Sequence, residues 1–161
     1  MACCHLLVPV KRLALAKTRL GDNPRRAELA LAFAADAVSA AIRCPSVTTV
    51  TVISDDPVAA DLLGRLGALV VADVPDSGLN PALAHAAAEL ALDCWIGALS
   101  ADLPALRPAE LAAVLDEVQS AGAPDGGYVP DHRDGTTLLL RPPGRALDPR
   151  FGPGSADAHA A

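Results

Sequence analysis

Hydrophobic positions in this chain gather into short apolar runs, separated by longer segments with helical spacing or a high alanine content. The apolar runs predict strands at residues 5–10, 47–53, 68–72 and 94–99, followed by two late strands at 128–129 and 136–140. The segments between them predict helices at 23–42, 54–67, 80–93 and 108–121. Strands that alternate with helices at this spacing predict an α/β fold with a mainly parallel, doubly wound sheet.

Helix starts are marked by a small polar residue followed by proline. This pattern occurs at Asn23-Pro24, Asp56-Pro57 and Asn80-Pro81. The polar side chain can accept backbone N–H groups of the first turn, and proline fits the first helical position. We therefore expect Asn23, Asp56 and Asn80 to cap helices, although Asn80 can equally serve a ligand.

Composition limits the classes of function. The chain has 161 residues, 52% of them hydrophobic and only 2% aromatic, which suits a single domain over residues 1–161 with an aliphatic core. A net charge of −6 argues against nucleic acid or an anionic membrane as partner. The chain has no apolar run long enough to span a bilayer and no signal-peptide pattern, so we expect a cytoplasmic protein. We expect its four cysteines to be buried, reduced thiols.

The stretch from Ser100 to Pro104 carries the first candidate for chemistry. Asp102 directly follows the apolar run 94–99, which places it past the carboxyl end of a buried strand. Open α/β sheets hold their ligands at that edge. A carboxylate there can bind Mg²⁺, which in turn binds phosphates. The simpler interpretation is an aspartate that only stabilises a turn.

Basic residues gather after the first predicted strand, at the same edge of the sheet. They are Lys11, Arg12, Lys17, Arg19, Arg25 and Arg26. A basic segment at this edge can bind a polyphosphate by charge, without a glycine-rich loop. The alternative is a solvated, arginine-rich loop on an acidic protein.

The tail is rich in glycine and proline and ends in a short predicted helix that begins at Ser155. The segment from Gly152 to Ser155 can offer backbone amides and a hydroxyl to an anion. An ordinary surface loop is the alternative. His159 follows this segment, where it can orient the loop.

Five short motifs in one order carry a resemblance to a known family. They are Val8-Pro9-Val10-Lys11 with Ala16-Lys17-Thr18-Arg19-Leu20, then Gly78-Leu79-Asn80, Ala101-Asp102-Leu103-Pro104, Asp134-Gly135-Thr136-Thr137, and Arg150-Phe151-Gly152 with Ser155 and His159. The series resembles the guanylyltransferases of deazaflavin cofactor (coenzyme F-420) biosynthesis, across essentially the whole chain. The resemblance implies a Rossmann-like nucleotidyltransferase fold related to the molybdopterin guanylyltransferases. It also implies Mg²⁺, GTP and a small phosphorylated carboxylic acid as acceptor.

The resemblance also implies roles for individual residues. It implies that Asp102 binds the metal, and that the acceptor acid is held by Thr137, Gly152 and Ser155. It implies that the GTP phosphates are bound by Lys11, Lys17 and Arg19, and that the nucleoside lies near Gly78 and Asn80. Together with Asp102, Lys17 and Arg19 are the expected catalytic residues. Adjacent strand residues face opposite sides of a sheet, so of the two threonines we expect only Thr137 to face the site.

The acceptor is phosphoenolpyruvate in the actinobacterial branch of that family, which this arginine-rich sequence resembles, and 2-phospho-L-lactate in the archaeal branch. A third candidate is 3-phospho-D-glycerate. The implied product, a guanylylated acid, passes to the next enzyme of the pathway. Family members continue several tens of residues further, with another strand and a second metal-binding aspartate. We therefore expect a domain incomplete at its C-terminus, lacking the last strand, with reduced stability and little or no guanylyl transfer activity.

Two other functions stay open at this point. A molybdenum-cofactor guanylyltransferase has the same fold but uses a glycine-rich loop after its first strand, and residues 11–20 contain no glycine. A non-catalytic module that binds a phosphorylated ligand or a partner subunit is the second alternative.

Overall fold

The apolar runs of the sequence form one six-stranded sheet. The computed structural model describes residues 3–13, 24–91 and 93–161. The strands are β1 (Cys4–Pro9), β2 (Thr49–Ile53), β3 (Leu69–Val71), β4 (Trp95–Leu99), β5 (Gly127–Pro130) and β6 (Thr136–Arg141). Their order in the sheet is β3-β2-β1-β4-β6-β5. The first four are parallel, whereas β6 runs antiparallel to β4 and β5 antiparallel to β6. The expected mainly parallel α/β sheet is confirmed.

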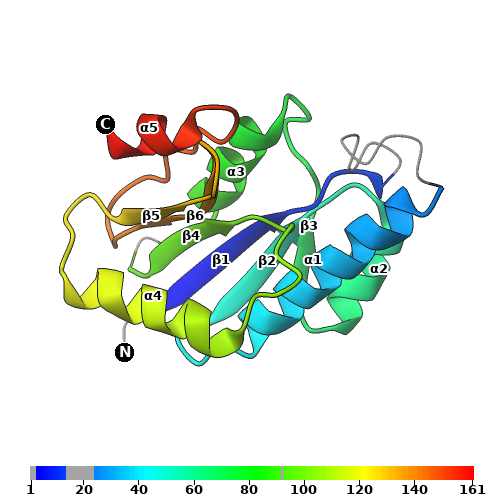
Figure 1. Cartoon of the computed structure of the whole chain (residues 1–161), viewed down its shortest axis with the longest axis horizontal. Helices are drawn as coiled ribbons and strands as arrows, with labels where there is room; N and C mark the ends of the chain where they lie inside the picture. Colours follow the sequence, from blue (N-terminus) through cyan, green and yellow to red (C-terminus); the bar gives the residue numbers. More distant parts are fainter. Residues whose placement is uncertain (1–2, 14–23, 92) are drawn as a thin grey trace.

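Helices cover both faces of the sheet, as Figure 1 shows. They are α1 (Arg26–Ile42), α2 (Pro57–Arg65), α3 (Leu79–Ala88), α4 (Pro108–Ser120) and α5 (Ser155–Ala160). α1, α2 and α4 pack on one face, and α3 packs on the other with the segment that leads to α5. Among residues 3–13, 24–91 and 93–161, no helix has the length and apolar character needed to cross a membrane.

The central strand β1 is buried from both sides. Leu6 and Val8 belong to the core cluster under α1, α2 and α4, whereas Leu7 belongs to the cluster under α3. All three side chains have no exposed surface. Successive side chains of a strand point to opposite faces, so a strand between two helical layers must be apolar at every position. This explains the continuous apolar run at residues 5–10.

The ends of three strands define the edge at which the predicted site residues meet. Parallel β1 and β4 both finish at this edge, and antiparallel β6 begins there. The backbone N–H of Ser100 donates to the carbonyl of Thr137 at 2.8 Å, which ties the segment after β4 to the start of β6. Lys11, Asp102 and Thr137 therefore share one edge of the sheet, as expected for an open α/β fold.

The cysteines differ in part from the expectation of four reduced thiols. Cys4 and Cys44 are free and buried, as expected. Cys3 and Cys94 instead form a disulfide, with a Cα–Cα distance of 5.0 Å. The two lie 91 residues apart in sequence. They meet because Cys4 pairs with Trp95 across parallel β1 and β4, which sets the preceding residues side by side.

Asp56 caps α2 and also holds the start of the basic segment. Its carboxylate accepts the backbone N–H groups of Val58 and Ala59 at 3.0 and 3.1 Å, and that of Leu13 at 2.9 Å. Burial acts to raise the pKa of Asp56, but these N–H donors outweigh it and bring the pKa below its ordinary value. One ionised side chain thus starts a helix and fixes the chain two residues beyond Lys11.

We expect Asp56→Ala to lower the free energy of unfolding by about 1–2 kcal/mol, because the cap is lost. A depressed folded-state pKa gives stability that is present above the unfolded pKa of about 3.9 and lost as pH falls through the folded value. Urea unfolding from pH 7 downward should show the wild-type advantage shrinking below about pH 4.

Asp56→Asn is the matched variant, because asparagine caps helices well but offers Leu13 no carboxylate. We expect an intermediate loss of stability. Asp61→Ala on the same helix, whose exposed partner is Arg65, should change stability little. An advantage of the wild type over Asp56→Ala that stays constant down to pH 2.5 would contradict the assignment.

Candidate functional site

Asp102 lies in the segment that leaves the carboxyl end of β4. Its side chain is exposed, and its backbone N–H donates to Ser100 Oγ at 3.4 Å. The serine hydroxyl thus shapes the turn. Mg²⁺ is commonly held by one or two carboxylates while phosphate and water oxygens complete its shell. An exposed carboxylate at this edge fits that chemistry.

The two threonines at the start of β6 face different neighbours. Thr136, not Thr137, lies beside Ser155, with 3.1 Å between the hydroxyl oxygens. Thr137 Oγ1 donates to the carbonyl of Val129 at 3.0 Å. The reason is a register shift: Val129 pairs with Leu138, and Pro130 pairs with Thr136, so β6 has one residue more than β5. Such a bulge re-aims side chains, and simple alternation cannot foresee it.

The loop from Arg150 to Ser155 is held by neighbours on several sides. Asp134 accepts the N–H of Gly154 through its carboxylate at 3.1 Å and the N–H of Ala156 through its carbonyl at 3.0 Å. Ser155 is only 1% exposed, whereas Gly152 is exposed and has a φ of +139°, a value that glycine adopts without strain. Gly152 therefore presents the accessible part of this loop, and the Ser155 hydroxyl faces inward.

Asn80 joins α3 to this loop. Its side-chain amide donates to the carbonyl of Phe151 at 3.0 Å and accepts the N–H of Phe151 at 2.8 Å. The expectation that Asn80 caps the helix is wrong, because α3 begins at Leu79 and Gly78 is the residue before it. The partner lies 71 residues away, so no local pattern could reveal it. Gly78, with a φ of +111°, is exposed at the same corner.

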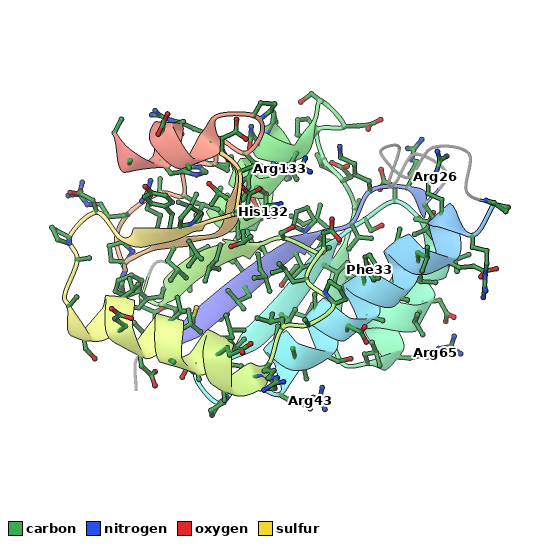
Figure 2. The ribbon with its side chains drawn as sticks, viewed as in Figure 1. Arg26, Phe33, Arg43, Arg65, His132 and Arg133 are labelled. Atoms are coloured by element: carbon green, nitrogen blue, oxygen red, sulfur yellow. A yellow bond between two sulfur atoms is a disulfide. The ribbon has the colours of Figure 1, made fainter. Side chains whose placement is uncertain are left out.

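The basic segment lies only partly within the described residues. Lys11 is exposed, and Arg12 lies 3.6 Å from the Asp55 carboxylate. Lys17 and Arg19, like Asn23, lie outside the described residues. Figure 2 labels two further basic residues, His132 and Arg133, in the turn between β5 and β6, where both are exposed. Because β6 begins at the edge where β4 ends, Arg133 adds a cation that the sequence analysis does not consider.

An acidic cluster next to Arg12 also escapes the sequence analysis. Asp55, Asp73 and Asp76 each place a carboxylate oxygen within 4.8 Å of the others. Burial is the main factor that raises the pKa of Asp73, the carboxylates of Asp55 and Asp76 add to it, and Arg12 opposes them. Asp55 also accepts the N–H of Asp73 at 3.0 Å. Asp55 therefore fastens β3 to the segment after β2, and it does not share the capping role of Asp56.

A pocket of about 780 Å³ lies at the other end of β6. Its lining includes Tyr128, Arg141, Arg145 and His159. Arg145 lies 3.6 Å from the carboxylate of Asp125, so part of the basic charge is neutralised. The motif residues meet instead at the carboxyl edge of β4, and we take that edge as the candidate active site.

Solved structures with a similar fold include transferases named for nucleotide-sugar or nucleotidyl transfer. One is a crystal structure assigned as a nucleotide-diphospho-sugar transferase from Desulfovibrio desulfuricans G20, with a TM-score of 0.67 and 19% identity over 88% of this chain and 64% of that one. Another is a nucleotidyl transferase from Methanothermobacter, with a TM-score of 0.52 and 17% identity over 86% and 70% of the two chains. These likenesses support the expected nucleotidyltransferase fold.

Sequence relatives are far closer. A phosphoenolpyruvate guanylyltransferase of Salinispora arenicola is 52% identical, with 97% of this chain and 74% of the relative covered. The relative of the same name in Thermomonospora curvata is 52% identical, with 97% and 70% covered, and that in Streptomyces avermitilis is 50% identical, with 97% and 74% covered. Residues 4–160 match the family described as guanylyl transferase CofC like. The expected family is confirmed, and this chain belongs to the CofC-like guanylyl transferases.

Proposed function

We propose that this protein transfers GMP from GTP to the phosphate of phosphoenolpyruvate, giving enolpyruvoyl-2-diphospho-5'-guanosine and pyrophosphate, in coenzyme F-420 biosynthesis. The observation that carries the proposal is about 50% identity, over nearly the whole chain, to relatives named for this reaction. The meeting of Asp102, Thr137 and the loop around Gly152 at one sheet edge supports it.

The reaction needs no nucleophilic side chain. The acceptor phosphate has a second pKa near 6, so it is mostly dianionic at neutral pH. One of its oxygens attacks the α-phosphorus of GTP, a new P–O bond forms, and the bond to the β-phosphate oxygen breaks. Pyrophosphate leaves with that electron pair. The protein has to bring two anions together and stabilise the leaving group.

Asp102 is the residue we assign to Mg²⁺. Its exposed carboxylate after β4 would offer one hard oxygen donor to the ion, and substrate phosphates would offer others. When bound, Mg²⁺ neutralises phosphate charge and favours departure of pyrophosphate. Asp102 fixes the position of this charge relative to the sheet.

Basic and small residues complete the proposed nucleotide site. Lys11 lies at the edge, and we assign it with Lys17 and Arg19 to the GTP phosphates, where ammonium and guanidinium groups offset negative charge. We assign Gly78 and Asn80 to the surroundings of the nucleoside. Because both atoms of the Asn80 amide already bond Phe151, we assign its contribution to holding this corner in shape.

Thr137, Gly152 and Ser155 form the proposed acceptor site. Thr137 connects through its carbonyl to Ser100, two residues before Asp102, so the residue assigned to the acid lies close to the residue assigned to the metal. Gly152 leaves room for a ligand, since nothing lies within 4 Å of an added Cβ. We assign Ser155 through its place in the same loop. We propose the cytoplasm as the place of this reaction.

The decisive experiment measures pyrophosphate release and product mass with GTP, Mg²⁺ and one of three acids. Phosphoenolpyruvate should support turnover, whereas 2-phospho-L-lactate and 3-phospho-D-glycerate should be poor acceptors. Turnover with 2-phospho-L-lactate in preference would reassign the acceptor. Binding of GTP and phosphoenolpyruvate without turnover would favour a non-catalytic module.

We expect Asp102→Asn to abolish Mg²⁺-dependent binding of phosphoenolpyruvate while the fold stays intact, because asparagine keeps the size but loses the negative charge that a hard cation requires. Calorimetric titration with and without Mg²⁺ measures the effect, and circular dichroism checks the fold. Asp36→Asn, an exposed change on α1, is the control. Parent-like Mg²⁺ and acid binding by Asp102→Asn would show the metal assignment to be wrong.

Thr137→Val should weaken phosphoenolpyruvate binding by about 1–2 kcal/mol, the range for a hydroxyl hydrogen bond to a charged group. The variant also removes the bond to Val129, so Thr137→Ser, which retains the hydroxyl, is the matched control. We expect the serine variant to bind nearly as well as the parent. A loss in the serine variant alone would mean that the methyl group, rather than the hydroxyl, is what the site needs, and equal losses in both variants would contradict a specific role for the hydroxyl.

A further inference from the structure

Both ring nitrogens of His159 are fixed by hydrogen bonds. Nε2 accepts the backbone N–H of Arg150 at 2.9 Å, and an accepting ring nitrogen carries no proton. In the neutral ring the proton therefore lies on Nδ1, which is 2.9 Å from Thr136 Oγ1. These partners assign the tautomer: Nδ1–H donates to Thr136, and Nε2 holds the backbone at Arg150.

The chain of hydrogen bonds continues into the loop of the acceptor site. Ser155 Oγ donates to the same Thr136 oxygen at 3.1 Å, and both side chains are buried. His159 thus reaches the loop at two points, at Arg150 directly and at Ser155 through Thr136. Gly152 lies between those two points. Loss of the His159 imidazole would remove a hydrogen bond near each end of the segment that carries Gly152.

Aromatic neighbours hold the imidazole ring in this orientation. The ring of Phe151 meets it edge-on at 5.3 Å between centroids, and Tyr128 on β5 lies at 6.2 Å. Edge-to-face contacts in this range are favourable. The side chain is therefore fixed by shape as well as by hydrogen bonds.

We propose that His159 is a positioning residue of the acceptor site: through Thr136 and the Arg150 backbone it holds the Gly152–Ser155 loop and the adjacent Thr137 in the arrangement that binds the phosphorylated acid. The inference rests on the proposed function. His159 touches neither substrate in this assignment. Its ring fixes the groups that do.

The charges around His159 favour the neutral ring that this arrangement needs. Burial is the first factor that lowers the pKa of His159, the cations Arg141 on β6 and Arg150 in the loop lower it further, and Asp148 in the same loop opposes them. Tyr128 faces the ring from β5. A protonated ring would present N–H at Nε2 to the Arg150 N–H, so two donors would face each other. The loop should therefore loosen as pH falls below about 6.5, the ordinary histidine value.

The test compares His159→Phe with His159→Asn. Phenylalanine keeps the ring contacts but makes no hydrogen bond, whereas asparagine retains a donor near the Nδ1 position. We expect His159→Phe to raise KM for phosphoenolpyruvate about tenfold, the effect of one lost hydrogen bond, with KM for GTP unchanged. His159→Asn should recover part of the loss. His85→Asn, on the exposed side of α3, is the control.

A pH series separates positioning from general stability. The acid itself titrates near pH 6 in every variant, so the quantity to compare is the KM ratio of His159→Phe to wild type. We expect this ratio to fall toward one between pH 7.5 and 5.5, because the wild type loses the same bonds on protonation. A pH-independent ratio, an equal rise of KM for both substrates, or no rise at all would overturn the proposal.

Two further measurements distinguish a failure of the His159 proposal from a failure of the proposed function. Calorimetry gives the dissociation constant of phosphoenolpyruvate with Mg²⁺ for each variant. A wild type that binds the acid without turnover contradicts guanylyl transfer, and the His159 effect on that constant then decides the proposal. A wild type that neither binds nor reacts overturns both. If His159→Phe does not fold, the ¹⁵N chemical shifts of the wild-type His159 ring provide the test. They must show a proton on Nδ1 and a pKa below 6.5 that changes when the acid binds. Any other pattern of shifts would overturn the proposal.

Discussion

The antiparallel pairing of β6 with β4 is the constraint on which the candidate site depends. A parallel strand at this position would begin at the far edge of the sheet, and residues 136–137 would lie a full strand length from Asp102. The reversal brings the start of β6 to the end of β4, where the Ser100 N–H meets the Thr137 carbonyl at 2.8 Å. Backbone hydrogen bonds thus set the separation between the proposed metal ligand and the proposed acid site before any side chain contributes.

Around this junction the Arg150–Ser155 loop is stiffened by side chains from outside the loop itself. Asn80 fixes Phe151, Asp134 fixes Gly154, and His159 fixes Arg150. Each bond replaces a water contact with a protein contact, and its net stabilisation is of order 1 kcal/mol. The loop has few regular hydrogen bonds of its own. Together, these three contacts give it a defined shape. A site that must hold a small, highly charged acid needs that preorganisation, since ordering a loop on binding would reduce affinity.

Much of the fold follows from local pattern. Continuous apolar runs predicted the buried strands, and Asp56-Pro57 predicted a helix cap that the structure contains. Features made by distant pairing were not predictable in the same way. The disulfide of Cys3 depends on the register of β1 and β4, and the role of Asn80 depends on a partner in another loop. The place of Asp102 after a buried strand and the glycine-rich segment at Gly152 made these two residues candidates, and family resemblance added Thr137. The sequence could not show that a bulge turns Thr136 toward Ser155.

That bulge makes the site sensitive to residue count as well as residue identity. The extra residue in β6 lets Thr136 meet α5 while Leu138 and Leu140 remain in the core on the opposite face. Insertion of one residue in β5 opposite the bulge would restore even pairing and turn the Thr136 hydroxyl toward the aliphatic layer under α4, although every existing amino acid kept its chemistry. Insertions and deletions in the hairpin between β5 and β6 are therefore a different class of change from substitutions. A substitution alters the contacts of one side chain, whereas a change in length alters the face of the sheet to which successive side chains of the strand point.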